Sequence, residues 1–511
     1  MSNHPGFHAI LVSTGVRASQ TRTPDRVAVT DDHRSFTYTQ MVDRFNRTGS
    51  LAKGLGLKHG DHVAIMSTNC VEYLEIVCGM ADVGVASAMV SPQATPREVA
   101  YICNDAEARI LFVHKSLEEV ARAAKLDTVK RIIVIGGDYE DVLQQARPEE
   151  PDWTVGQQDV FSIPYTSGTT GEPKGVMLSH QSRVMHMLIT HGMNAGCYQP
   201  SVRGLAIAPF FNGAGFINGL APIWFGGTVH MLQKFEAEET LKLISDRKIT
   251  VGFFVPTHFH AMFNLGAQTL AKYDVSSMRM AGSGAAALPQ ETKERIVAHF
   301  GEGRLFEGYG STEAGGISNL RPEDQLRKKS CVGLPLTGVE LKILDDDGNP
   351  VAEGEIGEVV CRNGWLFNGY WNKPEQTAEV LRDGWYYSGD LGRRDEEGYL
   401  YIVDRKKNVI ITGGQNVFPR EIEELLYHYP GVAEAAVIGK KDAYWGEAVT
   451  AYLVARSGET VDLDGLKAYC AKELAPYKVP KSFRLIDKMP KNGTGKIMHR
   501  DLKVEADKEV S

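Results

Sequence analysis

Residues 165–175 read YTSGTTGEPKG, and residues of these types suit the binding of phosphate. Glycine leaves the neighbouring backbone N–H groups open because it has no Cβ. Backbone N–H groups and hydroxyls can surround a phosphate, and Lys174 adds a point charge. The segment therefore predicts a loop that holds a phosphate group.

The spacing of this loop differs from the P-loop pattern G-x-x-x-x-G-K-[ST]. Counting from Gly168, the position of the second required glycine is Pro173. The position of the required hydroxyl residue after Lys174 is Gly175. The loop is thus directed to phosphate without being a Walker A motif. Taken alone, it could also be a surface linker, because glycine, serine and threonine runs are common in linkers.

Four other segments add chemistry: GYGSTEAGG (308–316), YYSGDLG (386–392), VDRKKNVIITGGQNVFPREIEE (403–424) and PKNGTGKIMHRDL (490–502). With the first loop, this ordered set resembles the adenylate-forming superfamily of acyl-CoA synthetases, luciferases and non-ribosomal peptide adenylation domains. The resemblance runs from about residue 20 to the end of the chain. Within the superfamily, the chain is most similar to a free-standing acyl-CoA synthetase, an AMP-forming acid–thiol ligase, because it carries no appended carrier-protein domain.

The resemblance implies a reaction in two half-steps that uses ATP, Mg²⁺ and CoA. A carboxylate attacks the α-phosphorus of Mg·ATP and gives an acyl-adenylate and pyrophosphate, and the CoA thiol then displaces AMP. Both half-steps spread negative charge, which needs cations and oriented donors more than a protein nucleophile. Lys496 resembles the catalytic lysine of the first half-step, which bridges the carboxylate and the α-phosphate.

The resemblance also implies an ATP site. Tyr309 would stack on adenine, Thr312 would contact the α-phosphate, and Glu313 would bind Mg²⁺, a hard cation that a carboxylate suits. Asp390 would accept the ribose hydroxyls, and Arg405 would reach the ribose or a phosphate. The residues expected around the β- and γ-phosphates are Thr166, Ser167, Gly168, Thr169, Thr170 and Lys174.

Lys407 falls at the position about which the family's C-terminal domain rotates between the two half-steps. A hinge must absorb a large change in φ and ψ, which an exposed residue without β-branching can do. Gly413 and Gly414 fit the loop that forms the pantetheine tunnel for CoA. Glycine lets the thiol arm pass close to the backbone.

Three stretches correspond to the family's acyl site: 209–216, 281–289 and 307–316. The family commonly has a histidine where this chain has Asn212, whose amide can donate a hydrogen bond but cannot titrate near neutral pH. The pocket residues expected from these stretches are Phe211, Asn212, Gly215, Gly284 and Gly308.

Small residues along these stretches leave room for a bulky or long acyl group. The stretches contain no lysine or arginine, which argues against dicarboxylates, because a second carboxylate would need a cationic partner. We therefore expect a hydrophobic monocarboxylic acid: medium- to long-chain, aromatic or alicyclic. The alternative is that the glycines serve turns and helix packing.

The elements that must position these residues alternate between strands and helices. DHVAIMS (61–67), ARILFVH (108–114) and VKRIIVIGG (129–137) are typical of buried strands. CVEYLEIVCGMADVGV (70–85) has apolar residues at helical spacing. The alternation predicts an α/β fold with parallel sheets flanked by helices.

The length of 511 residues exceeds what one core supports, so two or three domains are expected. Short alternating strands and the turn signal DDDGNP indicate a β-rich subdomain over about 331–404. Pro419 marks a helix start, and later apolar runs suit an α+β domain. We expect an N-terminal adenylation domain over 1–404 and a smaller, mobile C-terminal domain over 405–511.

Composition narrows the possible partners and the cellular compartment of the protein. The net charge of −8 disfavours a non-specific nucleic-acid partner. The seven cysteines form no CxxC pair, which favours reduced thiols in a cytoplasmic protein. No secretory signal or stretch of about 18 apolar residues is present, so no transmembrane segment is expected. A homodimer is plausible for such a synthetase.

Three rival functions share part of this pattern. A luciferase-like oxidative enzyme would carry the same motifs. An acyl-AMP ligase would stop at the adenylate and pass the acyl group to a carrier protein. A binding module without enzymatic activity should lack Glu313 and Lys496, and both are present.

Overall fold

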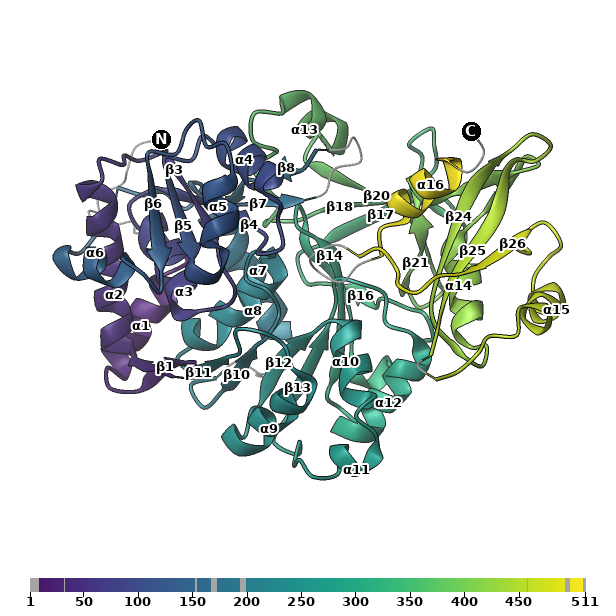
Figure 1. Ribbon diagram of the computed structural model, residues 1–511, viewed down its shortest axis with the longest axis horizontal. Helices are drawn as coiled ribbons and strands as arrows, with labels where there is room; N and C mark the ends of the chain where they lie inside the picture. The colour runs from purple at the N-terminus through teal and green to yellow at the C-terminus, as the bar shows by residue number, and fades with distance from the viewer. Residues whose placement is uncertain are drawn as a thin grey trace. The chain divides into compact units, whose positions relative to one another are not determined.

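The computed structural model describes residues 9–31, 33–151, 154–166, 172–193, 199–456, 458–491 and 497–508. The chain forms two compact units: Met1–Glu340 with Cys361–Tyr386, and Leu341–Val360 with Tyr387–Ser511. Figure 1 labels their helices and strands, coloured from purple at the N-terminus to yellow at the C-terminus. Both units combine helices with sheets, and the predicted α/β class is confirmed.

A nine-stranded sheet of the first unit has the order β16-β15-β14-β13-β12-β10-β11-β1-β2. The central strands from β14 to β1 pair in parallel, whereas β2, β15 and β16 pair antiparallel with their neighbours. The strands are β1 (Val27–Thr30), β2 (Ser35–Thr37), β10 (Arg203–Ala206), β11 (Thr228–Met231), β12 (Val251–Phe254), β13 (Met280–Ser283), β14 (Leu305–Ser311), β15 (Gly315–Leu320) and β16 (Leu334–Pro335).

A seven-stranded sheet of the same unit has the order β6-β5-β3-β4-β7-β8, with β9 also paired to β7. Its strands are β3 (His62–Met66), β4 (Ala86–Val90), β5 (Ile110–His114), β6 (Arg131–Ile135), β7 (Val160–Thr166), β8 (Lys174–Gly175) and β9 (Leu178–Ser179). Strands β3 to β7 pair in parallel, and the short β8 and β9 run antiparallel to β7. The predicted strands at 61–67, 108–114 and 129–137 are confirmed as β3, β5 and β6.

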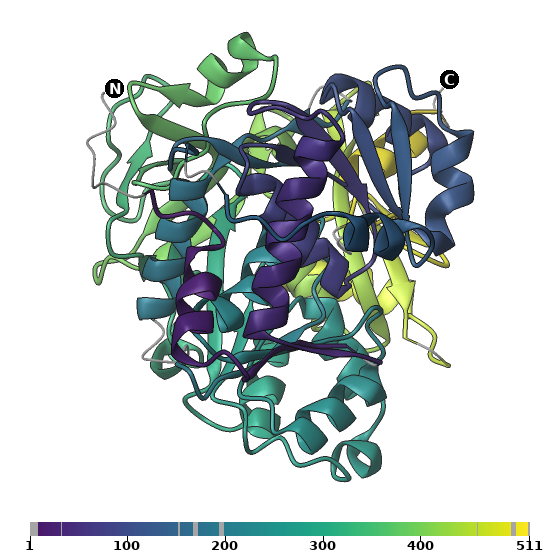
Figure 2. The same ribbon diagram turned by 90° about the vertical axis from the view of Figure 1, so that its left-hand side faces the viewer.

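Helices link and cover these strands. They are α1 (Thr14–Arg22), α2 (Tyr38–Gly54), α3 (Val71–Ala81), α4 (Pro96–Asp105), α5 (Glu118–Ala123), α6 (Tyr139–Gln145), α7 (His180–Met193), α8 (Gly213–Trp224), α9 (Ala237–Arg247), α10 (Pro256–Phe263), α11 (Ala267–Leu270), α12 (Gln290–Phe300) and α13 (Pro374–Val380). Helix α1 packs against α8 and α2 against α3, and the purple α1 and α2 face the viewer in Figure 2. The predicted helix near 70–85 is confirmed as α3.

Local signals explain why several of these helices begin where they do. Helix α4 follows a capping box, in which the Thr95 hydroxyl accepts from the Glu98 N–H and the Glu98 carboxylate accepts from the Thr95 N–H. Pro96 at its first position has no N–H to leave unpaired. Helix α2 starts with the same motif, built from Thr37 and Gln40.

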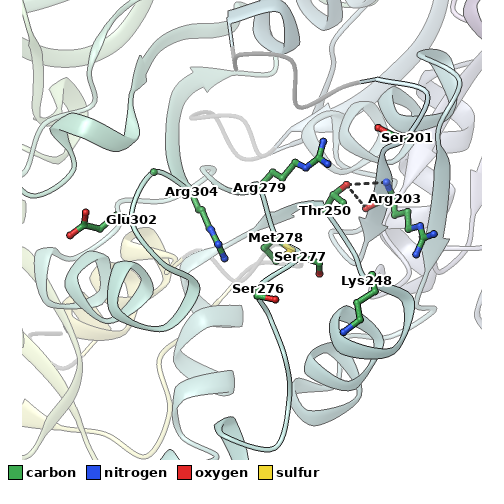
Figure 3. Close-up of a pocket in the computed structure, with 11 residues that line it drawn as sticks. Ser201, Arg203, Lys248, Thr250, Ser276, Ser277, Met278, Arg279, Glu302 and Arg304 are labelled. Atoms are coloured by element: carbon green, nitrogen blue, oxygen red, sulfur yellow. Dashed lines mark hydrogen bonds between the residues drawn. The ribbon is translucent and has the colours of Figure 1, made fainter.

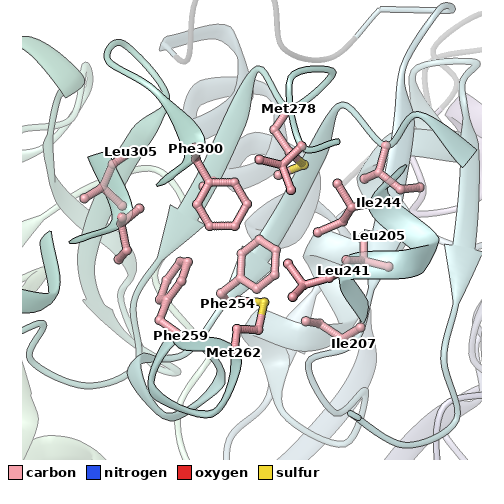
Figure 4. Close-up of a cluster of buried hydrophobic side chains, with 14 of the residues drawn as sticks. Leu205, Ile207, Leu241, Ile244, Phe254, Phe259, Met262, Met278, Phe300 and Leu305 are labelled. Carbon is pink, nitrogen blue, oxygen red and sulfur yellow. The ribbon is translucent and has the colours of Figure 1, made fainter. Parts of the chain in front are cut away.

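The core beneath the nine-stranded sheet is a cluster of aromatic and aliphatic side chains (Figure 4). Phe254 of β12 packs against Phe259 of α10 with ring centroids 5.0 Å apart, and Phe300 of α12 completes the aromatic group. Burying each such ring contributes about 1.5–3 kcal/mol. This packing fixes the strands whose carboxyl ends carry the predicted site.

The second unit contains two sheets. One has the order β17-β18-β20-β19 with β21 paired to β20, and the other has the order β23-β22-β25-β24 with β26 paired to β25. The strands are β17 (Glu340–Leu344), β18 (Gly357–Arg362), β19 (Leu381–Arg382), β20 (Trp385–Arg394), β21 (Leu400–Arg405), β22 (Ile410–Thr412), β23 (Gln415–Val417), β24 (Val432–Asp442), β25 (Gly446–Ala455) and β26 (Ser482–Leu485). Strand β19, the first residues of β20, the last two of β18 and the first of β17 belong to the first unit.

Three helices accompany the second sheet: α14 (Pro419–Tyr427), α15 (Leu463–Glu473) and α16 (His499–Lys508). Pro419 is the first residue of α14, as predicted. Residues 387–404 and 405–511 share this compact unit. The expected division into an adenylation domain (1–404) and a mobile domain (405–511) concerns movement, and it stays a prediction. Among the helices of the described ranges, none combines the length and apolar character that crossing a bilayer requires.

Candidate active site

The carboxyl ends of parallel strands carry most of the predicted site of the first unit. Strand β10 leads into residues 208–212, β13 into Gly284, and β14 into Thr312 and Glu313. Because β10, β12, β13 and β14 are neighbours, these segments lie along one edge of the sheet (Figure 1). In open α/β sheets ligands bind outside the carboxyl ends of the strands. The topology therefore brings the three predicted acyl-lining stretches together.

The predicted phosphate loop joins β7 to β8. Thr166 pairs with Lys174, and Tyr165 pairs with Gly175, so the two roots of the loop are adjacent rungs of one antiparallel ladder. The predicted phosphate contacts Ser167, Gly168, Thr169 and Thr170 lie outside the described residues.

Helix α4 holds both roots of this loop. The Tyr101 hydroxyl donates to the carbonyl of Pro173 at 3.0 Å, next to Lys174. The Tyr165 hydroxyl donates to Asp105 Oδ2 at 2.7 Å, and Lys373 Nζ lies 3.5 Å from Asp105 Oδ1. Burial, with the charge of Asp105 beside it, raises the pKa of Tyr165 well above its usual value, so the phenol stays protonated and donates.

Lys174 is buried in β8, with 8% of its surface exposed. Its ammonium lies 4.8 Å from the centroid of the Tyr370 ring, within the range of a cation–π contact. Sequence reasoning gave Lys174 the part of a point charge for phosphate, and it did not anticipate this aromatic neighbour.

The motif 308–316 forms the end of β14, a turn and the start of β15. Thr312 and Glu313 lie in the turn, which Ser311 braces by accepting from the Ala314 N–H at 3.0 Å. A Cβ on Gly310 would lie 2.0 Å from the Gly315 carbonyl oxygen, so a side chain there would break the turn. Tyr309, the residue before Gly310, is half-buried.

The Glu313 carboxylate accepts from the Tyr370 hydroxyl at 2.9 Å, and its carbonyl accepts from the Phe367 N–H at 2.8 Å. No group of three His, Cys, Asp or Glu side chains that could enclose a metal ion occurs in the described residues. Mg²⁺ in nucleotide sites is commonly held by one or two carboxylates together with substrate phosphates and water. Glu313 fits that pattern as the protein's share of the ligands.

Two residues at this turn were missed by sequence reasoning: Tyr370 and Arg183. Arg183 of α7 donates through Nη2 to the Thr312 carbonyl at 2.8 Å. Burial lowers the pKa of the Arg183 guanidinium to about 10, while the charge of Glu313 acts to raise it. Both residues are far from the motif in sequence, and neither belongs to a recognisable pattern.

The predicted acyl residues have different surroundings. The Asn212 side chain caps α8 by accepting from the Ala214 N–H at 3.3 Å. Phe211 is half-buried beside it. A Cβ on Gly215 would lie 2.1 Å from the Pro209 carbonyl oxygen, which shows a packing requirement at that position. Gly284 lies against the backbone of Gly308, since a Cβ on Gly284 would lie 3.1 Å from the Gly308 carbonyl oxygen.

In the second unit, Asp390 and Arg405 are directly opposite each other on β20 and β21. Arg405 Nε lies 3.0 Å from Asp390 Oδ1, and Asp390 is buried. This pairing orients the carboxylate, a group type that accepts hydrogen bonds from hydroxyls such as those of a ribose.

Lys407 is exposed in a short 3₁₀ turn (η3, Lys406–Asn408). Gly413 and Gly414 form the two-residue turn between β22 and β23, with φ of +55° and +78°. Positive φ at both positions is what a type I′ hairpin requires, and glycine adopts it readily. Lys496, the predicted catalytic lysine, lies outside the described residues.

A hollow of about 620 Å³ opens at the opposite, amino-terminal ends of the strands (Figure 3). Arg203, Lys248, Arg279 and Arg304 line it. Arg203 donates to the Arg247 carbonyl and Arg304 to the Phe300 carbonyl, at the ends of α9 and α12. Cations at helix C-termini are stabilising in themselves. These contacts explain the positions of Arg203 and Arg304, so no bound ligand is needed to account for them. We assign the hollow no part in the chemistry.

An α/β fold that gathers the predicted site residues at the carboxyl edge of a parallel sheet is typical of ligand-binding enzymes. A family model described as "AMP-binding enzyme" matches residues 16–371, and one described as "AMP-binding enzyme C-terminal domain" matches residues 421–496. The chain belongs to the AMP-binding enzyme family, and the expected membership of the adenylate-forming superfamily is confirmed.

Curated relatives are CoA ligases. A long-chain-fatty-acid–CoA ligase of Bacillus subtilis is 33% identical, covering 95% of this chain and 92% of its own. A feruloyl-CoA synthase of an Amycolatopsis species is 34% identical, covering 94% and 96%. The ATP-bound structure of MatB from Rhodopseudomonas palustris is 30% identical, with a TM-score of 0.90 and coverage of 98% and 99%. The predicted enzyme class, an AMP-forming acyl-CoA synthetase that uses ATP and CoA, is confirmed.

Proposed function

We propose that this enzyme activates a hydrophobic monocarboxylic acid and joins it to CoA, with Glu313 as its Mg²⁺ ligand. The observation that carries the proposal is the turn after β14, where Tyr370 holds the Glu313 carboxylate and Arg183 holds the Thr312 carbonyl. Both groups are thus fixed where an α-phosphate and its metal would arrive. Two of the relatives act on a long-chain fatty acid and on ferulic acid by name, which supports a hydrophobic acid.

In the first half-step an oxygen of the substrate carboxylate attacks the α-phosphorus of ATP, and pyrophosphate leaves. Bound Mg²⁺ would neutralise the phosphate charge that develops. Thr312 would donate to the α-phosphate, Tyr309 would stack on adenine, and Lys496 would bridge carboxylate and phosphate. The residues that would hold the β- and γ-phosphates are Thr166, Ser167, Gly168, Thr169, Thr170 and Lys174.

Asp390 and Arg405 would bind the ribose. Their ion pair orients the Asp390 carboxylate, which would accept hydrogen bonds from the two ribose hydroxyls. In the second half-step the CoA sulfur attacks the acyl carbon, the acyl–phosphate bond breaks and AMP leaves. Gly413 and Gly414 would border the pantetheine arm, and the C-terminal domain (405–511) would turn about Lys407 between the half-steps.

The acyl group would lie along β13 and β14. Gly284 directly follows β13, and Gly308 lies in the neighbouring strand β14. Because neither residue has a side chain, the backbone is uncovered at both positions. Phe211 would add apolar surface, while Asn212 is occupied in capping α8. An apolar acid gains about 25 cal/mol for each Å² of surface that it buries there.

We further propose that the enzyme works in the cytoplasm as a homodimer. The six cysteines in the described residues are free and buried, which suits a reducing compartment. Size-exclusion chromatography with light scattering would measure the mass of the protein in solution. A mass equal to that of a single chain would contradict the dimer.

Product analysis tests the proposed function. The purified enzyme is incubated with ATP, Mg²⁺, CoA and single acids: acetate, hexanoate, palmitate, benzoate, 4-coumarate, cyclohexanecarboxylate and malonate. We expect AMP, pyrophosphate and the acyl-CoA of a hydrophobic acid. Acyl-AMP without thioester would point to a carrier-protein acceptor instead, and ADP with phosphate would overturn the assignment.

The Lys496→Ala variant separates the half-steps. Loss of a preorganised charge that meets the reacting groups lowers rates by about 10²–10³-fold. We expect that loss in acyl-AMP formation, while thioester formation from supplied acyl-AMP stays near the wild-type rate. Lys467→Ala, which removes an exposed lysine of α15, is the matched control. Equal damage to both half-steps would contradict the role of Lys496.

A further inference from the structure

The positively charged side chain of Arg183 lies beside two of the three predicted acyl-lining stretches, 209–216 and 307–316. Those stretches contain no lysine or arginine of their own. Helix α7 packs against α8 and β15, and Figure 1 shows α7 next to α8. Its Arg183 contacts the turn after β14 and lies near the start of α8. Nη2 bonds to the Thr312 carbonyl, and a Cβ on Gly213 would lie 3.9 Å from the same nitrogen.

The guanidinium of Arg183 has more N–H donors than its neighbours supply acceptors. Its Nε has no hydrogen-bond partner in the described residues, and only 4% of the residue is exposed. Nη1 lies 3.4 Å from His186 Nδ1. His186 Nε2 accepts from the Gly316 N–H at 3.0 Å, so the proton of the neutral ring sits on Nδ1. Nδ1 and Nη1 therefore face each other as two donors, and that contact is not a hydrogen bond.

Within the described ranges, the Arg183 guanidinium also lacks a carboxylate in direct contact with its positive charge. The ion pairs found among the described residues include none with Arg183, and Glu313 acts on it only through its field. A buried cation or a buried donor without an acceptor destabilises a protein. Since Glu313 already offsets part of the positive charge, a neutral oxygen is enough as a further acceptor for the guanidinium.

The neighbouring backbone favours the same kind of group. Helix α8 begins beside the guanidinium, and the N–H groups of a helix start attract oxygen atoms. Gly213, its first residue, presents no side chain toward Nη2. A side chain at this position would lie between the guanidinium and the Thr312 methyl group, which is 4.0 Å from the same point.

We propose that the substrate acid carries, on its hydrophobic body, a neutral oxygen acceptor such as a hydroxyl, ether or keto oxygen, and that Arg183 binds it. Arg183 is then the specificity-determining residue of the acyl site. The inference rests on the proposed function and narrows it to oxygen-bearing hydrophobic acids.

Matched pairs of acids test this assignment: 4-coumarate and cinnamate, 4-methoxybenzoate and 4-methylbenzoate, 12-hydroxydodecanoate and dodecanoate. For at least one pair we expect the wild-type kcat/KM to favour the oxygenated acid by about tenfold or more, the scale of one hydrogen bond in a buried site. Arg183→Met should abolish this preference by raising KM for the oxygenated acid. Because Arg183→Met also removes the bond to the Thr312 carbonyl, kcat falls for both members of a pair, and the readout is the ratio of their kcat/KM values.

Arg183→Gln keeps an amide donor and should retain part of the preference, and it serves if the Met variant does not fold. Arg279→Met removes an exposed arginine of the amino-terminal hollow and is the matched control. Equal kcat/KM within every pair, or a loss in Arg183→Met that is the same for both members, would overturn the inference. So would a preference for a dicarboxylate. In each of these cases acyl-CoA is still formed, whereas no acyl-CoA from any acid would overturn the proposed function itself.

Discussion

Tyr370 connects two site residues that come from different parts of the chain. Its hydroxyl donates to Glu313, and its ring faces the Lys174 ammonium. The residue lies on a segment that pairs with the end of β8, because Val176 forms a bridge with Tyr370 and the Trp371 N–H donates to the Gly175 carbonyl. One side chain thus links the root of the phosphate loop to the proposed Mg²⁺ ligand.

Tyr370→Phe separates the two contacts, because it removes the hydroxyl and keeps the ring over Lys174. A hydrogen bond to a charged group is worth about 1.5–3 kcal/mol, so Glu313 should lose its fixed orientation. We expect acyl-AMP formation at limiting Mg²⁺ to fall about ten- to hundredfold, with recovery at high Mg²⁺. Tyr444→Phe, at an exposed tyrosine, is the control. An unchanged Mg²⁺ dependence would contradict the link.

The residue scale also shows what sequence reasoning could reach. Glu313, Asp390 and Lys407 were predicted because each lies inside a short motif that resembles the family's. Tyr370 and Arg183 contact the same turn from 57 and 129 positions away, and contacts at such separations leave no local pattern. The roles of the motif residues themselves stay predictions that the variants described above test.

At the scale of elements, α4 links helix formation to the phosphate loop. Its capping box fixes where the helix starts, and Tyr101 and Asp105, one turn apart, then meet the two roots of the loop. The hairpin of β7 and β8 supplies only two paired residues on each side. Contacts from α4 are therefore needed to hold the roots in register.

Tyr101→Phe removes the hydrogen bond to the Pro173 carbonyl and leaves the ring in place. A neutral hydrogen bond contributes about 0.5–1.5 kcal/mol, so we expect KM for ATP to rise about two- to tenfold. The melting temperature should hardly change, because the hydroxyl serves the loop rather than the core. Tyr273→Phe removes a comparable hydroxyl bond to Glu238 at the surface and is the control. A KM for ATP as in the wild type would show that α4 does not restrain the loop.

Elements were predicted well where periodicity was strong and poorly where pairing was short. The buried runs of β3, β5 and β6 and the helix α3 follow from their apolar patterns. The two-residue strand β8 carries no pattern of its own, since its pairing depends on Tyr165 and Thr166. The capping role of Asn212 was likewise hidden, because the same amide suits a helix start or a ligand.

At the scale of the whole molecule, the proposed rotation at Lys407 concerns the contacts of Asp404. The Asp404 carboxylate accepts from the N–H of Arg405 at 2.7 Å and from the N–H of Arg420 at 2.9 Å. These partners lie before and after Lys407, so the buried Asp404 spans the predicted turning point. The proposed rotation at Lys407 would break the bond to Arg420, at the start of α14. That bond would then exist in only one of the two half-steps.

Lys407→Pro and Lys407→Ala test this alternation as a matched pair. Both remove the lysine side chain, but only proline fixes φ near −65° and removes the N–H. We expect Lys407→Ala to stay within about threefold of the wild type in both half-steps, since the exposed ammonium is not needed for turning. Lys407→Pro should keep one half-step near the wild-type rate and lower the other by about tenfold or more, because rotation about one backbone bond is lost. Acyl-AMP formation and thioester formation from supplied acyl-AMP, measured separately, give the comparison. If proline slows both half-steps alike, or neither, the turning point lies elsewhere in the chain.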